Sequence, residues 1–280
     1  MEKIFIFGST AVDVSVKTDG DGSVFTTLGG KGSNQAVAAK RAGGDVTLAS
    51  KIGGDSWGGF ALDFWRRERL DHSASIVDDS ANTGIAAVII DGVGENRIIR
   101  GENPNRALTD TDAAFFASQL PERGIFLTQL SADVSVVLKL LRLAKNRGLT
   151  TILDTPYVKP PPEELWQYVD IITPNEQEAK RFGTAPVKRK VVTLGAKGVY
   201  VTDGVTERII PPFAVEVADT TGAGDAFNGA FAALLAEGAD IFEAARHGNA
   251  AGALCASKRG AAIAMPYRQE IEALIRGANL

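Results

Sequence analysis

A carboxylate that follows three very small residues is the strongest chemical signal in the chain. Residues 219–228 read DTTGAGDAFN, in which Gly222, Ala223 and Gly224 come directly before Asp225, and strong helix formers follow. Free N–H groups and the dipole at a helix N-terminus favour an anion. A carboxylate beside that anion can accept the proton of an attacking hydroxyl while the amides stabilise a phosphoryl group. Capping by Asp225 alone would not require three small residues, so the stretch predicts a phosphoryl-transfer site with Asp225 as base.

Two further stretches could bind a small polar ligand. Residues 28–44 read LGGKGSNQAVAAKRAGG, and their spacing does not match the Walker loop. A ligand-contacting loop with polar Asn34 and Gln35, or a tight strand–helix turn, explains this stretch equally well. Asp13 follows the first predicted strand, at the end of the sheet where ligands bind in open α/β folds. Its carboxylate could accept hydrogen bonds from vicinal sugar hydroxyls, and a solvated turn aspartate is the alternative.

Polar residues in the second half of the chain allow two interpretations each. Asn175 and Glu178 lie three residues apart and could share a hydrated Mg²⁺, although a helix capping box explains them better on local grounds. Asn249 lies among small residues, where it could face an adenine ring or be a satisfied core residue. Residues 191–201, VVTLGAKGVYV, predict a strand, a glycine-containing turn and a second strand.

The elements that must position these residues are predicted by the hydrophobic pattern. Short apolar strands are predicted at residues 3–8, 45–53, 124–130, 150–155, 169–175 and 189–195. Helical patterns are predicted at residues 32–43, 133–148 and 175–183, and residues 215–238 predict a strand, a turn and a helix. Strands that alternate with helices indicate a parallel sheet with helices on both faces.

Two segments with period-two alternation interrupt this order. Residues 13–27 alternate around an Asp-Gly-Asp-Gly turn, and residues 83–101 predict a strand, a glycine-rich turn and a strand. Their likeness predicts a small β lid over about residues 14–28 and 83–100. We expect this lid to project from a single domain that spans residues 1–280, and two hairpins unrelated in space are the alternative.

The composition predicts a globular protein of a reducing compartment. The 280 residues are 45% hydrophobic and 23% charged, and a net charge of −4 without a dense Lys/Arg run argues against nucleic-acid binding. Cys255 is the single cysteine, so an internal disulfide is excluded and a cytoplasmic location is expected. The first residues lack the features of a signal peptide, and no apolar run reaches the roughly 18 residues of a membrane span, so no membrane partner is expected.

Four motifs, in matching order and spacing, resemble the ribokinase-like carbohydrate kinases of the phosphofructokinase-B (PfkB) type, and within that family the ribokinase branch. They are GGKGSNQAVAA, DIITPNEQEA, VVTLGAKGVY and DTTGAGDAFNGA, and the likeness covers almost the whole chain. The resemblance implies a three-layer α/β/α sandwich with a mainly parallel central sheet and a small β lid over the sugar. It implies a kinase that uses ATP, Mg²⁺ and a monovalent cation, K⁺. In ribokinases two subunits associate through their lids, so the resemblance also implies a homodimer.

The resemblance further implies roles for individual residues. Asp225 would be the catalytic base, and the anion hole would be Gly222, Ala223 and Gly224. Sugar-binding positions are matched by Asp13, Gly30, Lys31 and Asn34. Nucleotide-side positions are matched by Asn175, Thr193, Gly195, Gly198 and Asn249. Glu178 would act on Mg²⁺ through water. The monovalent-cation site would use Asp219, the carbonyl of Thr221, and loop carbonyls near Cys255, Lys258 and Gly260.

Several departures from the family pattern affect the sugar site. Ala11 stands where ribokinases have Asn, Ser131 where they have a sugar-contacting Glu, and Ala264 where they have a Ser, and the first lid hairpin is shorter. Each lost polar contact could cost about 1–3 kcal/mol if a ligand hydroxyl were left unpaired. Two such losses are enough to change substrate preference. These departures do not touch Asp225.

The sequence therefore favours an ATP-dependent kinase for the primary hydroxyl of a small sugar, a pentose of the ribose or deoxyribose type. A nucleoside kinase of the same fold is the alternative within this class. A sugar- or nucleotide-binding regulator without catalysis is the alternative from another class. A nicotinamide-dependent oxidoreductase is disfavoured because the first strand lacks the G-x-G-x-x-G fingerprint.

Overall fold

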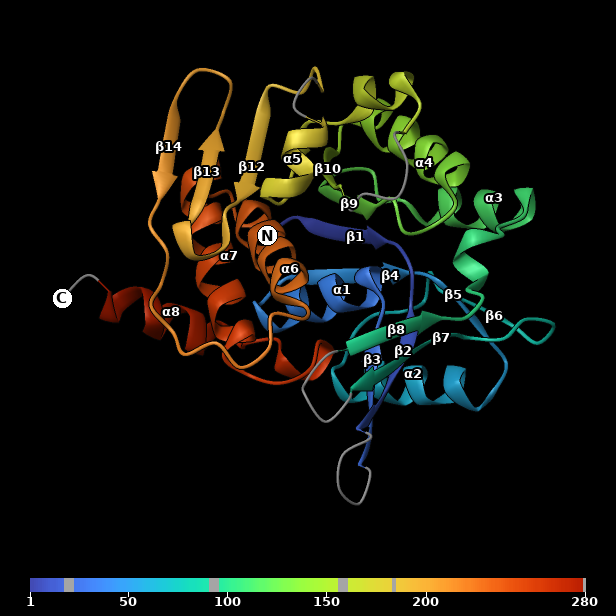
Figure 1. Cartoon of the computed structure of the whole chain (residues 1–280). Helices are drawn as coiled ribbons and strands as arrows, with labels where there is room; N and C mark the ends of the chain where they lie inside the picture. The colour runs from blue at the N-terminus through green and yellow to red at the C-terminus, as the bar shows by residue number, and fades with distance from the viewer. Residues whose placement is uncertain (18–22, 91–95, 156–160, 183–184, 279–280) are drawn as a thin grey trace.

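A central sheet of eight strands organises the protein (Figure 1). The computed structural model describes residues 1–17, 23–90, 96–155, 161–182 and 185–278. The strand order is β14-β13-β12-β11-β10-β9-β1-β4. Neighbouring strands from β12 to β4 run parallel, and β13 and β14 are antiparallel additions at one edge. The predicted α/β class with a mainly parallel sheet is confirmed.

The strands and helices alternate along the chain. The central strands are β1 (Lys3–Phe7), β4 (Asp45–Ala49), β9 (Ile125–Gln129), β10 (Thr150–Asp154), β11 (Ile171–Ile172), β12 (Arg189–Thr193), β13 (Val199–Thr202) and β14 (Glu207–Ile210). The α-helices are α1 (Lys31–Arg41), α2 (Ser56–Arg67), α3 (Asp110–Gln119), α4 (Val134–Asn146), α5 (Glu176–Phe182), α6 (Ala223–Ala236), α7 (Ile241–Ala256) and α8 (Arg268–Gly277). Short 3₁₀ turns include η1 (Pro104–Arg106), η3 (Gly195–Lys197) and η4 (Ala262–Ala264).

Helices cover both faces of the sheet and bury two apolar cores, which makes three layers (Figure 1). Strand β1 shows how the sequence divides between them, because alternate side chains of a strand point to opposite faces. Ile4 and Ile6 pack in the core shared with α1, α6 and α7. Phe5 and Phe7 pack in the core shared with α3 and α4. Both faces of this strand are buried, as its continuous apolar run predicts.

A second, four-stranded sheet stands apart from the main one (Figure 1). It contains β3 (Val24–Gly29), β2 (Ala11–Lys17), β7 (Gly84–Ile90) and β8 (Asn96–Arg100), in that order. β2 and β3 are antiparallel, as are β7 and β8, and β2 pairs with β7 in parallel from Ala11↔Gly84 to Lys17↔Ile90. The two segments with period-two alternation thus form one sheet. Their predicted turns, Asp-Gly-Asp-Gly at 19–22 and the glycine-rich turn at 91–95, lie outside the described residues.

Three predicted strands differ from those observed. Residues 45–53 form two strands, because the chain leaves the main sheet at Ser50 and β5 (Lys51–Gly53) pairs with β6 (Ile76–Asp78) instead. Residues 169–175 give only the two-residue β11. The strand predicted from residue 215 is absent, since residues 211–219 contain no strand. Pro211 and Pro212 follow β14 and lack the N–H donors that a strand ladder needs, so the ladder ends there.

Candidate active site

Asp225 lies in the first turn of α6, as predicted, and only 6% of the residue is exposed. The helix is preceded by Gly222, whose φ of 80° and ψ of −4° place it in the left-handed region that favours glycine. Ala223 N donates to Thr220 O at 3.2 Å. The amides of Gly224 and Asp225 come next and, as first-turn groups, have no acceptor within the helix. The N-terminus of α6 therefore offers N–H groups beside a buried carboxylate.

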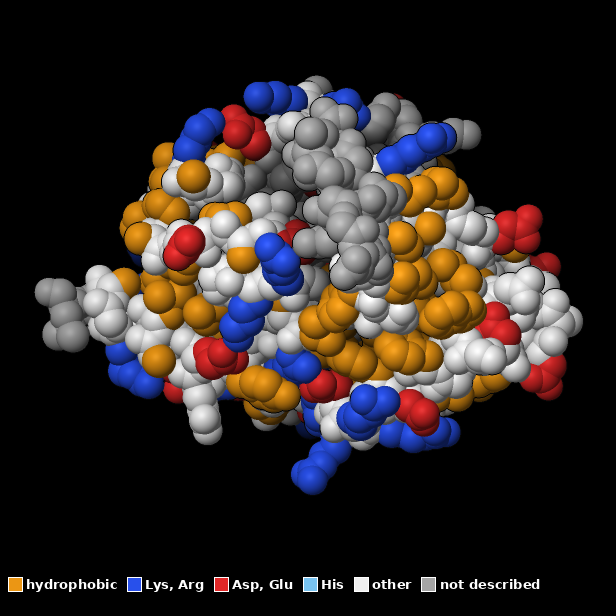
Figure 2. Space-filling view, turned by 60° about the horizontal axis from the view of Figure 1, so that its bottom comes forward, with side chains coloured by type: hydrophobic (Ala, Val, Ile, Leu, Met, Phe, Trp, Pro, Cys, Tyr) orange, Lys and Arg blue, Asp and Glu red, His pale blue; other side chains and the backbone are white. Residues whose placement is uncertain are grey.

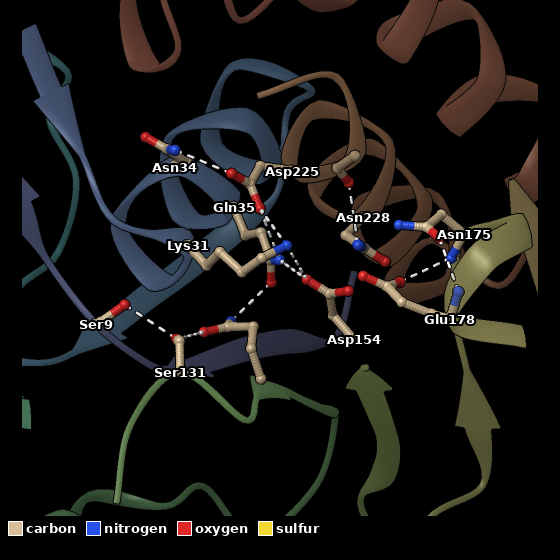
Figure 3. Close-up of polar contacts among 12 residues, drawn as sticks. Ser9, Lys31, Asn34, Gln35, Ser131, Asp154, Asn175, Glu178, Asp225 and Asn228 are labelled. Atoms are coloured by element: carbon tan, nitrogen blue, oxygen red, sulfur yellow. Dashed lines mark hydrogen bonds and ion pairs between the residues drawn. The ribbon is translucent and has the colours of Figure 1, made fainter. Parts of the chain in front are cut away.

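The carboxylate of Asp225 is held by amide side chains from α1 (Figure 3). Asn34 Nδ2 donates to Asp225 Oδ2 at 2.9 Å, and Gln35 Nε2 donates to Asp225 Oδ1 at 3.0 Å. Asn34 and Gln35 are themselves buried. Helix α1 begins after Gly30, whose φ is 87°; a Cβ there would lie 2.6 Å from Ala11 N. The glycine-rich stretch is thus a close-packed strand–helix turn that also delivers polar side chains to Asp225.

A second buried carboxylate, Asp154 at the end of β10, lies next to the first (Figure 3). Lys31 Nζ lies 3.0 Å from Asp154 Oδ2 and 3.7 Å from Asp225 Oδ1. Gln35 Nε2 donates to Asp154 Oδ2 at 2.8 Å as well as to Asp225. Burial raises the pKa of Asp154 and Lys31 opposes this shift. Burial alone would lower the pKa of Lys31, but Asp154 and Asp225 outweigh it and raise that pKa.

Hydroxyl and amide groups from the strand ends β1 and β9 continue this network (Figure 3). Gln129 Nε2 donates to Gln35 Oε1 at 2.7 Å. Ser131 Oγ lies 3.4 Å from Gln129 Oε1 and 3.0 Å from Ser9 Oγ. Ser131, one of the departures from the family pattern, is therefore hydrogen-bonded within the protein and does not place a carboxylate here.

Asp13 lies inside β2 and not in a turn, near enough to Asp225 for the two charges to interact. Burial raises its pKa to about 6, Arg100 opposes the shift, and the charge of Asp225 adds to it. A Cβ on Gly29, the partner strand's last residue, would lie 2.3 Å from Asp13 Oδ2, so only glycine leaves room for this carboxylate. Asp13 and Asp225 are thus close enough to interact, although 212 positions separate them in the sequence (225 − 13).

The residues predicted for the nucleotide side gather at neighbouring strand ends. Asn175 and Thr193 form an isolated parallel bridge, which joins the start of α5 to the end of β12. Gly195 begins η3, and Gly198 is the residue that caps its end, with a φ of 92°. A Cβ on Gly198 would lie 2.0 Å from Ile210 O. Asn249 Nδ2 donates to Pro211 O at 2.8 Å. Asn249 is half-buried at the surface of α7, so it is not a core residue.

The Asn175 and Glu178 contacts are those of a capping box. Asn175 Oδ1 accepts from Glu178 N at 2.9 Å, and Glu178 Oε2 accepts from Asn175 N at 2.8 Å. The local interpretation of this pair is therefore the observed one. Within the described ranges, no three His, Cys, Asp or Glu side chains cluster closely enough to hold a metal by themselves.

The residues predicted for a monovalent cation also lie together. Asp219 Oδ1 accepts from Thr221 N at 2.9 Å and its Oδ2 accepts from Gly260 N at 3.2 Å, which lowers its pKa against the effect of burial. Lys258 N donates to Cys255 O at 3.0 Å, and the Cys255 thiol lies 3.7 Å from Thr221 O. Burial, with Asp225 and Asp219 nearby, raises the pKa of Cys255 to about 12, so the thiol stays neutral.

Asp154, Gln129 and Asn228 belong to this region and were not predicted. Asn228 Nδ2 donates to Gly224 O at 3.0 Å, while its buried Oδ1 has no hydrogen-bond partner among the described residues (Figure 3). Asp154 could have been found, because a carboxylate at the carboxyl end of a parallel strand lies where ligands bind. Gln129 occupies the same position on β9. Nothing in the sequence marks Asn228 as a site residue, apart from its being a polar residue in an apolar helix.

The raised pKa of Asp13 predicts that this residue destabilises the fold at neutral pH. Since the carboxyl keeps its proton more tightly in the folded state, the free energy of unfolding falls as the pH rises from about 4 through about 6. We expect Asp13→Asn to raise the free energy of unfolding by about 1–3 kcal/mol at pH 8 and to change it little at pH 4. Urea unfolding at both pH values measures this.

The exposed Asp45→Asn serves as the matched control and should change stability by less than about 0.5 kcal/mol at either pH. An Asp13→Asn protein that is no more stable than wild type at pH 8 would show that burial of this carboxylate carries no penalty.

Comparisons with known proteins identify the family of the chain. A family model described as pfkB family carbohydrate kinase matches residues 1–268. A ribokinase of Haemophilus influenzae is 35% identical over 260 residues, which cover 86% of this chain and 85% of that protein. A ribokinase of Bacillus subtilis is 33% identical over an alignment of 296 residues, which covers 98% of this chain and 100% of that protein.

Solved structures show the same architecture. A ribokinase of Thermotoga maritima superposes with a TM-score of 0.87 at 29% identity and covers 99% of this chain and 100% of its own. An Arabidopsis thaliana ribokinase, solved in complex with ribose and ATP, gives a TM-score of 0.88 at 26% identity and covers 98% of this chain and 99% of its own. The ribokinase-like three-layer fold is thereby confirmed, and the chain belongs to the pfkB family of carbohydrate kinases.

Proposed function

We propose that this protein transfers the γ-phosphoryl group of ATP to the primary hydroxyl of a small sugar, a pentose of the ribose or deoxyribose type. The observation that carries the proposal is the buried carboxylate of Asp225 at the N-terminus of α6, held on both oxygens by Asn34 and Gln35. A sugar hydroxyl placed at this carboxylate would also face the first-turn amides of α6. That arrangement combines a base with an anion hole.

In the proposed reaction Asp225 accepts the proton of the sugar hydroxyl. The hydroxyl oxygen forms a bond to the γ-phosphorus while the bond from that phosphorus to the β–γ bridging oxygen breaks, and ADP leaves. The α6 amides of Gly222, Ala223 and Gly224 form the anion hole around the transferred group, with Ala223 N partly engaged by Thr220 O. Lys31, whose side chain is one-third exposed, lies between two carboxylates and can also approach a phosphate oxygen.

Sugar binding is assigned to Asp13, Gly30, Lys31 and Asn34. Asn34 Oδ1 is buried and has no partner among the described residues, while its Nδ2 is held by Asp225. A buried acceptor of this kind is costly unless a ligand supplies a donor, and a sugar hydroxyl is one. Ala11 carries no polar side chain, and the hydroxyls of Ser9 and Ser131 are bonded to each other, so a sugar that lacks a ring hydroxyl at these residues would leave neither hydroxyl unpaired.

The nucleotide is assigned to the side lined by Asn175, Thr193, Gly195, Gly198 and Asn249. Space is available there, since a Cβ on Gly195 or on Gly224 would meet no atom within 4 Å. Mg²⁺ would be held through water by Glu178, with the orphaned Asn228 Oδ1 nearby as an oxygen donor, which suits a cation that keeps most of its waters. When bound, Mg²⁺ neutralises charge on the phosphates.

A monovalent cation, K⁺, is assigned to the loops that Asp219 ties together. The donor set is a carboxylate from Asp219 with backbone carbonyls of Thr221 and the loop near Cys255, Lys258 and Gly260, and oxygen ligands suit such a cation. Because Thr221 directly precedes the helix cap Gly222, order in these loops would fix the N-terminus of α6. Cys255 as a neutral buried thiol fits the expected cytoplasmic location.

We further propose that the chain acts as one kinase domain, with the four-stranded sheet as its lid. Asp13 stands on the inner face of that sheet, so closure would bring this carboxylate onto the sugar and exclude water from the γ-phosphate. Within the described residues no helix combines the length and apolar character needed to cross a membrane.

The substrate is tested by ADP release with a panel of pentoses, deoxypentoses, hexoses and nucleosides, each with and without K⁺. We expect turnover only with a pentose, at about 1–100 s⁻¹ as is usual for kinases, and higher with K⁺. Turnover with a nucleoside alone would identify a nucleoside kinase. Sugar binding without any ADP release would identify a regulator, and either result would overturn the proposal.

A homodimer is proposed from the outer face of the lid sheet. Val16 pairs with Val24, and Ala87 pairs with Ile99, on the face opposite Asp13. Val24 is 67% and Ile99 is 49% exposed. Hydrophobic side chains gather on the side of the molecule that carries this sheet (Figure 2). An apolar sheet face of this kind is typical of a protein interface.

Sedimentation of the wild type should give twice the monomer mass. We expect Val24→Asp or Ile99→Asp to give the monomer, because a charge buried without a partner opposes association. Val205→Asp is the matched control, since Val205 is 94% exposed on the distant turn between β13 and β14 and should leave the dimer intact. A monomeric wild type would contradict the proposal.

A further inference from the structure

Asp154 is a buried carboxylate that the reaction described above does not use. It ends β10 with 3% exposure, and it touches two of the groups that surround Asp225. Its Oδ2 accepts from Lys31 Nζ at 3.0 Å and from Gln35 Nε2 at 2.8 Å. The same Gln35 nitrogen donates to Asp225 at 3.0 Å. One amide and one ammonium are therefore shared between two carboxylates.

The position of the ammonium is the informative feature. Lys31 Nζ lies 0.7 Å closer to Asp154 Oδ2 than to Asp225 Oδ1 (3.7 − 3.0). Without a negative charge at residue 154, the nearest buried carboxylate to Lys31 would be Asp225. A direct ion pair there would stabilise the charged form of the base and oppose its uptake of a proton.

The charges of Asp154, Lys31 and Asp225 also favour proton uptake by Asp225. With both carboxylates charged, Asp154, Asp225 and Lys31 together carry two negative charges and one positive charge. After Asp225 has accepted the hydroxyl proton, the Asp154–Lys31 pair that remains is neutral. Proton transfer to Asp225 thus relieves the repulsion between two carboxylates in a site from which water is largely excluded.

We propose that Asp154 is a positioning residue for this reaction: its carboxylate holds Lys31 and Gln35 beside Asp225, keeps Lys31 from pairing fully with the base, and thereby favours proton transfer to Asp225. The inference rests on the proposed function of Asp225. In the proposed reaction Asp154 touches neither the sugar nor the phosphate and acts through Lys31 and Gln35.

The other charged and titratable groups that face Asp225 come from three elements. Lys31 is contributed by α1, Asp13 by β2 and the neutral thiol of Cys255 by α7. The charge of Glu178, at the start of α5, also helps to raise the pKa of Lys31. Among the described residues, Asp154 is the one group besides Asp225 that contacts both Lys31 and the Gln35 amide, so its replacement should change the site without removing a ligand of Asp225.

The test is the pH dependence of kcat for Asp154→Asn, which keeps the volume and can still accept the Lys31 and Gln35 hydrogen bonds through its oxygen. We expect kcat on the plateau to fall about 10- to 100-fold, the loss typical of a misplaced catalytic group. The acidic limb should move to lower pH by about one unit, since Lys31 now favours the charged base, while the sugar KM changes less. Asp154→Ala should show the same shift with a larger loss of kcat.

Asp112→Asn is the matched control. Asp112 forms a comparable buried ion pair, at 2.9 Å with Lys51, but lies at the start of α3 away from Asp225. We expect it to lower the melting temperature without moving the acidic limb. An acidic limb of Asp154→Asn within about 0.2 units of wild type would overturn the proposal, because a purely structural role would lower kcat and stability but leave the titration in place.

Crystal structures give a readout that does not depend on turnover. In the wild type, Lys31 Nζ should lie nearer to Asp154 than to Asp225, and in Asp154→Asn it should move into direct contact with Asp225 Oδ1. A wild-type structure in which Lys31 is paired with Asp225 would overturn the proposal, and so would an Asp154→Asn structure in which Lys31 has not moved. Both results count even if no sugar in the panel is phosphorylated. Absence of turnover in the wild type would count against the kinase assignment alone.

Discussion

The crossing of α1 over α6 is the constraint on which the rest of the site depends. The two helices approach so closely that a Cβ on Gly229 would lie 2.5 Å from Ala38 Cβ and 2.6 Å from Ala39 N. This close approach brings Asn34 and Gln35 within hydrogen-bonding distance of Asp225, whose own helix supplies the free amides. The carboxylate, its donors and the first-turn amides of α6 are therefore fixed by a packing contact between small residues in the core.

The site carries buried charge and buried polar atoms that the core must stabilise. Asp154 and Asp225 are both nearly inaccessible, Asp13 has its pKa raised by burial, and the buried oxygens of Asn34 and Asn228 have no partner among the described residues. Each of these features lowers stability when no ligand is bound. They cluster where the sheet ends face the lid, whereas both apolar cores lie along the sheet itself. A functional site is the usual reason for this separation.

Much of this arrangement could be predicted from the sequence, because it is encoded locally. The N-terminus of α6, the position of Asp225 in its first turn, the turn at Gly198 and the capping box of Asn175 and Glu178 all follow from short motifs. Strand β1 was predictable because its continuous apolar run has one interpretation in a parallel sheet. The roles assigned to these residues stay proposals.

What could not be predicted depends on tertiary contacts. Asp154 and Gln129 stand at the carboxyl ends of strands, so their positions could have marked them as candidates. Their contacts could not be predicted, because nothing near them in the sequence shows that they meet Gln35. The strand predicted from residue 215 fails for the converse reason. Its alternation is that of a strand, but the main sheet already ends at β14, and Ala218 N and Asp219 N donate instead to Ala256 O at the end of α7.

The most direct test of the proposed reaction is the turnover of Asp225→Asn, which keeps the shape of the side chain and removes the base. We predict that kcat falls by about 10²–10⁴-fold, the contribution typical of a general base, while sugar and ATP still bind. A variant that phosphorylates the sugar at a near-normal rate would show that Asp225 does not accept the proton of the attacking hydroxyl.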